Sequence, residues 1–275
     1  KCYKKGYGIE KNLEKAFYWY QKSANQNNNS NSQYNLGKFY QIGCVVEKNL
    51  VKAFYWYHKS ANQNNNNAQY CLAEFYQNGW KIKKNLEKAF YWYQESANQN
   101  NSNAQYCLAE FYQNGWNIEK DIEKAFYWYQ ESADQNNSNS QYNLGKFYQN
   151  GWGIERNLKK AFNLYQKSAD QNNSNAQYSL GKFYQNGWGI EKNLEKAFYL
   201  YQKSADQNNC NAQYSLGEFY QNGWSIKKGL EKALFWYQKS VENNNNEAFN
   251  CLTNLANNDN KIAQYTLAKC YHYGW

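Results

Sequence analysis

From Ala104 to Asn139 the chain reads AQYCLAEFYQNGWNIEKDIEKAFYWYQESADQNNSN, and close copies of these residues recur along most of its length. Each copy contains the tripeptide Lys-Ala-Phe or its variant Lys-Ala-Leu. The alanines of these tripeptides are 36 residues apart, except at the first step of 37, and stand at Ala16, Ala53, Ala89, Ala125, Ala161, Ala197 and Ala233. A fixed period of about 20 to 50 residues is typical of repeat architectures.

The first half of each copy predicts an amphipathic helix, which we name helix A. From Ala104 to Tyr112 apolar residues recur at three- and four-residue spacings. Asn103 is the expected N-cap, and Gly115 stands where a helix ends in a left-handed residue. The equivalent expected caps are Asn67, Asn139, Asn175 and Asn211, and the equivalent glycines are Gly43, Gly79, Gly151, Gly187 and Gly223.

The second half predicts helix B, from Ile122 to Ala133, with Asp121 as its N-cap. The equivalent caps are Asn12, Asn49, Asn85, Asn157 and Asn193, with Gly229 as the exception. Small residues occupy the middle of helix A at Gly37, Ala73, Ala109, Gly145, Gly181 and Gly217. Because glycine weakens a helix by about 1 kcal/mol relative to alanine, we expect helix B to approach closely at this position.

One such pair of helices cannot bury its aromatic side chains, so the pairs are expected to stack. The sequence therefore predicts an all-α fold, an α/α superhelical solenoid of 36-residue helix-turn-helix repeats. We expect a single solenoid over residues 1–275, with a partial repeat at 1–31 and six complete repeats at 32–247. An irregular C-terminal repeat follows at 248–275, where the features of helix A begin twice, at Ala248 and at Ala263.

The shared motif AQYxLGxFYQNGWGIEKNLEKAFYWYQKSA resembles the Sel1-like repeat, a relative of the tetratricopeptide repeat, over nearly the whole chain. The resemblance implies a non-enzymatic scaffold or adaptor that presents an extended concave surface, lined by the A helices, to a protein or peptide. It also implies membership of a larger signalling or quality-control protein. Asn-rich tracts replace the usual short turn between repeats, which is a departure from the family pattern.

Charge and composition exclude few partners. The net charge of +9 comes from 31 Lys and Arg against 22 Asp and Glu, without a block of five like charges. No apolar run of about 18 residues predicts a membrane-spanning helix, so no membrane insertion is expected. The chain opens at Lys1 and contains no Met, which suggests a piece of a longer protein.

The cysteines predict a reducing compartment, and hence a cytoplasmic location. They are odd in number, form no close pair, and stand at Cys2, Cys44, Cys71, Cys107, Cys210, Cys251 and Cys270. Secreted bacterial relatives carry a cysteine pair in each repeat, and this chain does not. Sequons at Asn28, Asn100, Asn136 and Asn172 leave a secretory lumen open as the alternative.

Catalysis is not predicted, because the two histidines, His58 and His272, do not repeat and have no evident partner. Neither is a cofactor or a metal. The Gly-x-Gly loops at 151–153 and 187–189 lack a preceding strand, which a dinucleotide site requires. Cys71 and Cys107 have no further ligands to complete a zinc site.

Differences between the copies predict where a partner binds. The fourth residue of helix A is Asn35, Cys71, Cys107, Asn143, Ser179 and Ser215 in turn, and the seventh is Lys38, Glu74, Glu110, Lys146, Lys182 and Glu218. Residues three apart share one helix face, so these two sets would form a groove of alternating charge. The alternative is neutral drift on a solvated face.

A single-stranded RNA-binding repeat is the competing hypothesis, although we expect nucleic acid to be an unlikely partner. It depends on a row of lysines on helix B and on rings that could stack bases, at Trp19, Trp56, Trp92, Trp128 and Trp236. Leucine replaces the ring at two positions, Leu164 and Leu200, which favours packing over stacking. Both ends of the chain would expose a half-repeat, so end-to-end self-association is also expected.

Overall fold

The computed structural model describes residues 12–26 and 28–274, and every regular element in those ranges is an α-helix, which confirms the all-α prediction. The helices are α2 (Leu13–Gln26), α3 (Ser30–Ile42), α4 (Leu50–Ala61), α5 (Asn66–Asn78), α6 (Leu86–Asn98), α7 (Ser102–Asn114), α8 (Ile122–Asp134), α9 (Ser138–Asn150), α10 (Leu158–Asp170), α11 (Ser174–Asn186), α12 (Leu194–Ala205), α13 (Cys210–Asn222), α14 (Leu230–Glu242), α15 (Asn246–Asn257) and α16 (Lys261–Tyr273).

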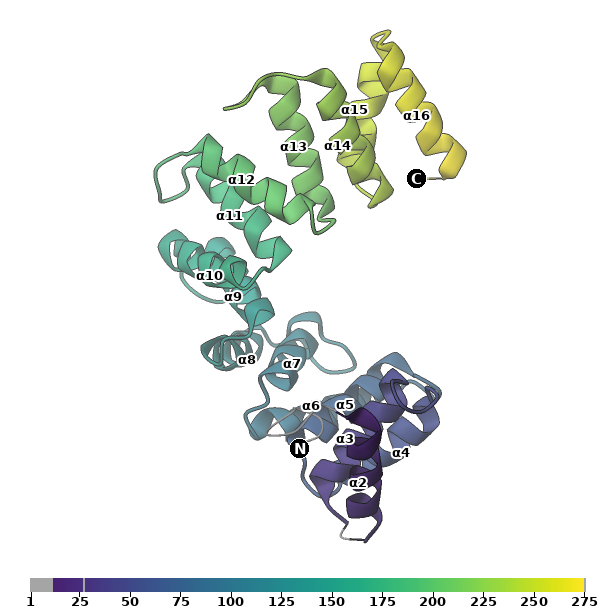
Figure 1. Cartoon of the computed structure of the whole chain (residues 1–275). Helices are drawn as coiled ribbons and strands as arrows, with labels where there is room; N and C mark the ends of the chain where they lie inside the picture. The colour runs from purple at the N-terminus through teal and green to yellow at the C-terminus, as the bar shows by residue number, and fades with distance from the viewer. Residues whose placement is uncertain (1–11, 27, 275) are drawn as a thin grey trace. The chain divides into compact units, whose positions relative to one another are not determined.

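The chain divides into two compact units, Lys1–Asn137 and Ser138–Trp275. In each unit the closest packing joins helices A and B of one repeat, for example α5 with α6 and α11 with α12. Each B helix then packs on the next A helix, as α6 does on α7 and α12 on α13 (Figure 1). Each unit is therefore a solenoid of stacked helix pairs, in which α3 to α13 with odd numbers are A helices and α4 to α14 with even numbers are B helices.

The predicted helix ends are confirmed at three of the four kinds of terminus. Gly115 ends α7 with a left-handed φ of 68°, and its N–H donates to Phe111 O. Asp121 begins α8, where its Oδ1 accepts from the Lys124 N–H at 2.9 Å. Helix B ends in the Asn-rich tracts as expected. Gly229 precedes α14 without a side-chain cap.

The predicted caps of helix A are wrong by two residues. Asn101, rather than Asn103, caps α7, and its Oδ1 accepts from the Ala104 N–H at 3.1 Å. Asn100 adopts a left-handed φ of 59°, which turns the chain so that Asn101 is the extended residue before the helix. The same correction applies to Asn67, Asn139, Asn175 and Asn211, which lie inside α5, α9, α11 and α13.

These displaced asparagines have another role, because they join one repeat to the next. The Asn173 amide group caps α11 through its oxygen, and its Nδ2 donates to Asn139 Oδ1 at 2.9 Å. The same bond, always between residues 34 apart, recurs from Asn65 to Asn31, Asn101 to Asn67, Asn137 to Asn103, Asn209 to Asn175 and Asn245 to Asn211. We name this series the asparagine ladder.

The prediction of close approach at the small residues of helix A is confirmed. A Cβ added to Gly181 would lie 2.6 Å from a ring carbon of Tyr201, on the facing helix α12. Tyr201 is fully buried and donates a hydrogen bond through Oη to Gln185. Equivalent buried tyrosines face Gly37, Gly145 and Gly217, so the core of each repeat is centred on a tyrosine of helix B.

The irregular C-terminal repeat contains two helices that both begin like helix A. Asn245 caps α15 and Asn260 caps α16, and only residues 258–260 separate the two helices. No glycine ends α15, so the connection that normally leads from helix A to helix B is missing. Helix α14 consequently packs on both α15 and α16. Tyr265 and Tyr271 of α16 are 64% and 69% exposed, and end-to-end association stays a prediction.

Candidate partner-binding face

The twelve predicted partner-binding residues lie on the A helices of both units. We name this set the partner-binding face, and we describe the six residues of each unit separately. Unit 1 supplies Asn35, Lys38, Cys71, Glu74, Cys107 and Glu110, and unit 2 supplies Asn143, Lys146, Ser179, Lys182, Ser215 and Glu218. Ser215 is buried, and the other eleven are half-buried rather than fully solvated.

The glutamates at the seventh position accept a hydrogen bond from a tyrosine one turn earlier. Tyr70 Oη donates to Glu74 Oε1 at 2.9 Å, and Tyr106 Oη donates to Glu110 Oε1 at 2.7 Å. Tyr214 makes the same bond to Glu218 at 3.3 Å. Residues four apart are neighbours on a helix, so this contact requires no tertiary rearrangement.

The lysines at the same position use the same tyrosine in another way. Lys146 Nζ lies 5.7 Å from the centroid of the Tyr142 ring, and Lys182 Nζ lies 5.8 Å from that of Tyr178. These distances are within the range of cation–π attraction. A carboxylate binds the hydroxyl edge and an ammonium binds the ring face, so the tyrosine accommodates either charge.

The fourth position contacts tyrosines of the preceding repeat. Cys71 interacts with the hydroxyl of Tyr57 and lies near Tyr34. The ring centroids of these two tyrosines are 5.9 Å apart. Burial, and secondarily Glu74, raise the pKa of the Cys71 thiol to about 12, so this thiol is protonated at neutral pH. Burial likewise raises the pKa of the Cys107 thiol, which interacts with Tyr93.

Burial also raises the pKa of the carboxyls of Glu74 and Glu110, while the hydrogen bonds from Tyr70 and Tyr106 oppose that shift. A half-buried carboxylate whose pKa is raised is poorly solvated. It gains more from an incoming cationic group than a fully hydrated one does, because less water has to be removed. The acidic part of the face in unit 1 is therefore suited to a lysine or arginine side chain.

The sequence reasoning missed the third residue of helix A. Tyr34, Tyr70, Tyr142 and Tyr178 are half-buried and hold the variable residues in place. They do not vary between copies, so a search for differences passes over them. The signal that could have found them is their spacing, four residues before the variable charge.

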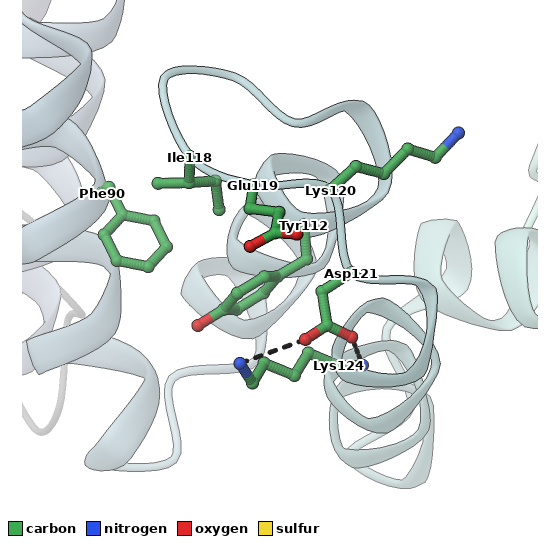
Figure 2. Close-up of a pocket in the computed structure, with 7 residues that line it drawn as sticks. All are labelled: Phe90, Tyr112, Ile118, Glu119, Lys120, Asp121 and Lys124. Carbon is green, nitrogen blue, oxygen red and sulfur yellow. Dashed lines mark hydrogen bonds and ion pairs between the residues drawn. The ribbon is translucent and has the colours of Figure 1, made fainter.

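The other candidate sites are explained by local structure. The connection from α7 to α8 forms a pocket of about 340 Å³ (Figure 2). Its carboxylate Asp121 caps α8 and pairs with Lys124 Nζ at 3.1 Å, and Glu119 adds a second acidic group. Lys120 and Lys124 balance the two carboxylates, so the charged groups of this pocket are two of each sign.

Most of the rings and lysines of the RNA hypothesis contact other residues of the chain, although Trp19 is 50% exposed. Trp92 and Trp236 pack against core clusters around Tyr57 and Tyr201. Lys88 Nζ lies 5.4 Å from the ring centroid of Tyr76. The same contact recurs at Lys52, Lys124, Lys160, Lys196 and Lys232. These contacts favour the interpretation of the tryptophans as packing residues.

Within residues 12–26 and 28–274, no group of three or more His, Cys, Asp or Glu side chains is arranged to hold a metal ion. No helix there has both the length and the apolar character to cross a membrane. His58 contacts Asn62 and the ring of Phe54, and His272 contacts Tyr273.

The fold and the face together define a helical-repeat solenoid with a tyrosine-supported surface of variable charge. The Sel1 repeat model matches residues 1–28, 30–65, 66–101, 102–137, 138–173, 174–209, 210–258 and 261–275, and the chain belongs to the Sel1 repeat family. Sel1 repeats usually bind proteins. No curated protein matches the chain.

Solved structures agree with this assignment. The chain is similar to a protective antigen of uropathogenic Escherichia coli strains that displays an SLR fold, with 27% identity, a TM-score of 0.78, and coverage of 98% of this chain and 58% of the antigen. It is also similar to a Sel1 repeat protein from Oxalobacter formigenes, with 30% identity and a TM-score of 0.75. The match covers 84% of this chain and 98% of that protein. This chain therefore spans little more than half of the antigen's length.

Proposed function

We propose that this chain is a non-enzymatic scaffold that binds a protein or peptide partner through the partner-binding face. The observation that carries the proposal is the change of charge at the seventh position of helix A. Glutamate and lysine are both compatible with the tyrosine beneath them, so packing does not determine which one is present. Because packing accepts either residue, the charge at this position can be set by the partner that the chain recognises.

Each unit offers its own chemistry. In unit 1 Glu74 and Glu110 stand in successive repeats after Lys38, and in unit 2 Lys146 and Lys182 stand in successive repeats before Glu218, so two of the three charges in each unit have the same sign. We propose that the face of unit 1 binds a basic peptide segment and that of unit 2 binds an acidic one. A role in a larger signalling or quality-control protein, and a cytoplasmic location, are further parts of the proposal.

The experiment selects peptides from a random display library on the whole chain and sorts them by net charge. The variant Glu74→Lys with Glu110→Lys should bind the basic peptides at least tenfold more weakly and retain the acidic ones. The variant Lys146→Glu with Lys182→Glu should do the reverse. Affinities are measured by isothermal titration at two salt concentrations.

A matched control has the same change in net charge on another surface. Glu87 and Glu123 are exposed on α6 and α8, so Glu87→Lys with Glu123→Lys alters the long-range field equally without touching the face. Equal losses in this control and in the face variant would show that the peptides respond to net charge alone, which would contradict the proposal. Selection of no peptides by the native chain would contradict it as well.

A further inference from the structure

Two B helices of unit 2, α10 and α12, have leucine where other repeats have an indole, at Leu164 and Leu200. Trp92 packs against the core cluster of the preceding repeat, which contains Ala61. Trp236 packs in the same way against the cluster that contains Ala205. At the equivalent place in α12 the side chain is Leu200, and it packs against the cluster that contains Ala169.

The smaller side chain leaves space. A pocket of about 370 Å³ is lined by Leu200 and Ala169, together with Gln166, Asp170, Tyr199 and Lys203. The exposure of the alanine reports the same gap independently. Ala61 and Ala205, whose clusters receive a tryptophan, are each 2% exposed, whereas Ala169 is 8% exposed.

The rim of the pocket has groups suited to an aromatic guest. Tyr199 is 56% exposed, and Lys203 Nζ lies 4.7 Å from the centroid of its ring. Asp170 provides a carboxylate, held by a hydrogen bond of 2.8 Å from Gln166 Nε2 to its Oδ1. An indole has an apolar body and a single N–H donor, so it can contact the two aliphatic side chains, Leu200 and Ala169, while its N–H donates to an acceptor of the largely polar rim.

We infer that this pocket binds the tryptophan side chain of a partner protein. The chain itself shows the fit, because its own Trp92 and Trp236 occupy the corresponding place in other repeats. The pocket shares no residue with the partner-binding face. It relies on the proposed function only in that the guest belongs to a protein, and the two can fail separately.

The test titrates N-acetyl-L-tryptophanamide into the whole chain with labelled alanine and leucine methyl groups, followed by NMR. Saturable shifts are expected at the methyls of Ala169 and Leu200, with a dissociation constant on the order of 1 mM. The methyl of Ala205 should not shift. The face variant Glu74→Lys with Glu110→Lys should leave this binding unchanged.

Two reciprocal variants distinguish specific binding in the pocket from non-specific binding to the protein surface. Leu200→Trp fills the gap with the side chain found in other repeats, and it should weaken binding at least tenfold. Trp236→Leu opens the same gap over Ala205, and it should create a second site reported by that methyl. If Trp236→Leu does not fold, Trp92→Leu with the methyl of Ala61 serves the same purpose.

Absence of saturable shifts at Ala169 would overturn the inference, and so would equal binding by Leu200→Trp. Adenosine 5′-monophosphate is titrated in parallel. Tighter binding of this nucleotide at Ala169 would assign the pocket to a nucleobase and overturn the assignment to tryptophan.

Discussion

Helices α7 and α11 occupy the same place in their repeats, yet three positions differ together. Helix α7 has Cys107, Ala109 and Glu110, whereas α11 has Ser179, Gly181 and Lys182. In both helices a leucine and a phenylalanine are fully buried and a tyrosine supports the seventh residue. The large apolar residues therefore set the fold, while the small and charged residues between them are exchangeable.

The widest physical difference is at the glycine. A Cβ at residue 181 would lie 2.6 Å from a ring carbon of Tyr201, whereas the equivalent residue of α7 is Ala109, which already has a Cβ, and Tyr129 of that repeat is as buried as Tyr201. Repeats with glycine at this position, which we name the glycine type, therefore pack against their tyrosine without spare room. Repeats with alanine there, the alanine type, must accommodate one more carbon.

The largest expected loss of stability comes from placing a larger side chain at the glycine of helix A. Gly181→Val places two methyl groups against Tyr201, and we expect the free energy of unfolding to fall by about 3 kcal/mol, measured by urea denaturation. The matched change Ala73→Gly only loosens its helix and should cost about 1 kcal/mol. An unchanged urea midpoint for Gly181→Val would show that the glycine type has hidden room, and the comparison would break down.

The caps should not distinguish the units, because both use the same geometry. Asn101→Ala in unit 1 and Asn173→Ala in unit 2 should each cost about 1–2 kcal/mol, since each removes a cap and one bond of the asparagine ladder. Asn67→Ala and Asn139→Ala remove only the ladder acceptor and should cost about 0.5–1 kcal/mol. The free energy of unfolding is measured by thermal unfolding. Equal losses in the cap variants and the acceptor variants would refute a separate contribution from the cap.

Exchanging the charge within a helix should hardly affect stability. Glu110→Lys loses the hydrogen bond from Tyr106 but can place its ammonium over the same ring, as Lys182 does over Tyr178. We expect a change within about 0.5 kcal/mol by urea denaturation. Glu110→Ala can use neither contact and is the control. A markedly larger loss for lysine than for alanine would mean that the tyrosine does not accept both charges.

The smallest effect is a dependence on pH that only the acidic helices should show. Burial raises the pKa of Glu74 and Glu110 in the folded chain, so the folded state holds protons that the unfolded chain has released. Stability should therefore fall as pH rises through the interval above the ordinary glutamate pKa of 4.5. Glu74→Gln with Glu110→Gln should be about 0.5 kcal/mol more stable than the native chain at pH 7 and equal to it at pH 4.

The check is a series of unfolding curves between pH 4 and pH 8, with Lys182→Gln as the comparison from a basic helix. A constant difference between the glutamine variant and the native chain across that series would contradict the assigned cause.

Periodicity was enough to predict the helix pairs, the glycines that end helix A and the caps of helix B. It failed at the caps of helix A because Asn100, Asn101 and Asn103 have similar intrinsic preferences. Only the left-handed turn at Asn100 decides among them, and that turn depends on contacts with neighbouring loops: the equivalent Asn64 Oδ1 accepts from Gln99 Nε2 of the next repeat at 2.8 Å. Such a contact is invisible in one copy of the motif.

The sequence predicted which residues of helix A share a face, but it did not predict the contacts that surround them, and their role in binding stays a prediction. Spacing placed the fourth and seventh residues on one face of each A helix, for example Cys71 with Glu74, and the helical conformation of α5 agrees with this. It did not reveal that Tyr70 and Tyr178 lie beneath Glu74 and Lys182, or that Cys71 is shielded by tyrosines of the preceding repeat. The contacts of Tyr70 and Tyr178 lie within one helix, and their spacing of four residues could have indicated them. The contact of Cys71 with tyrosines of the preceding repeat depends on how closely neighbouring helices pack, and this distance cannot be read from the order of residues.

The asparagine ladder has a consequence for how such a gene can change. Every bond joins residues 34 apart, so an extra copy of 36 residues arrives with its own donor and acceptor and continues the ladder on both sides. An insertion of another length between donor and acceptor separates them and interrupts it. Whole-repeat duplication is thus the tolerated event, and the number of repeats becomes a trait that selection can adjust to the length of whatever the chain binds.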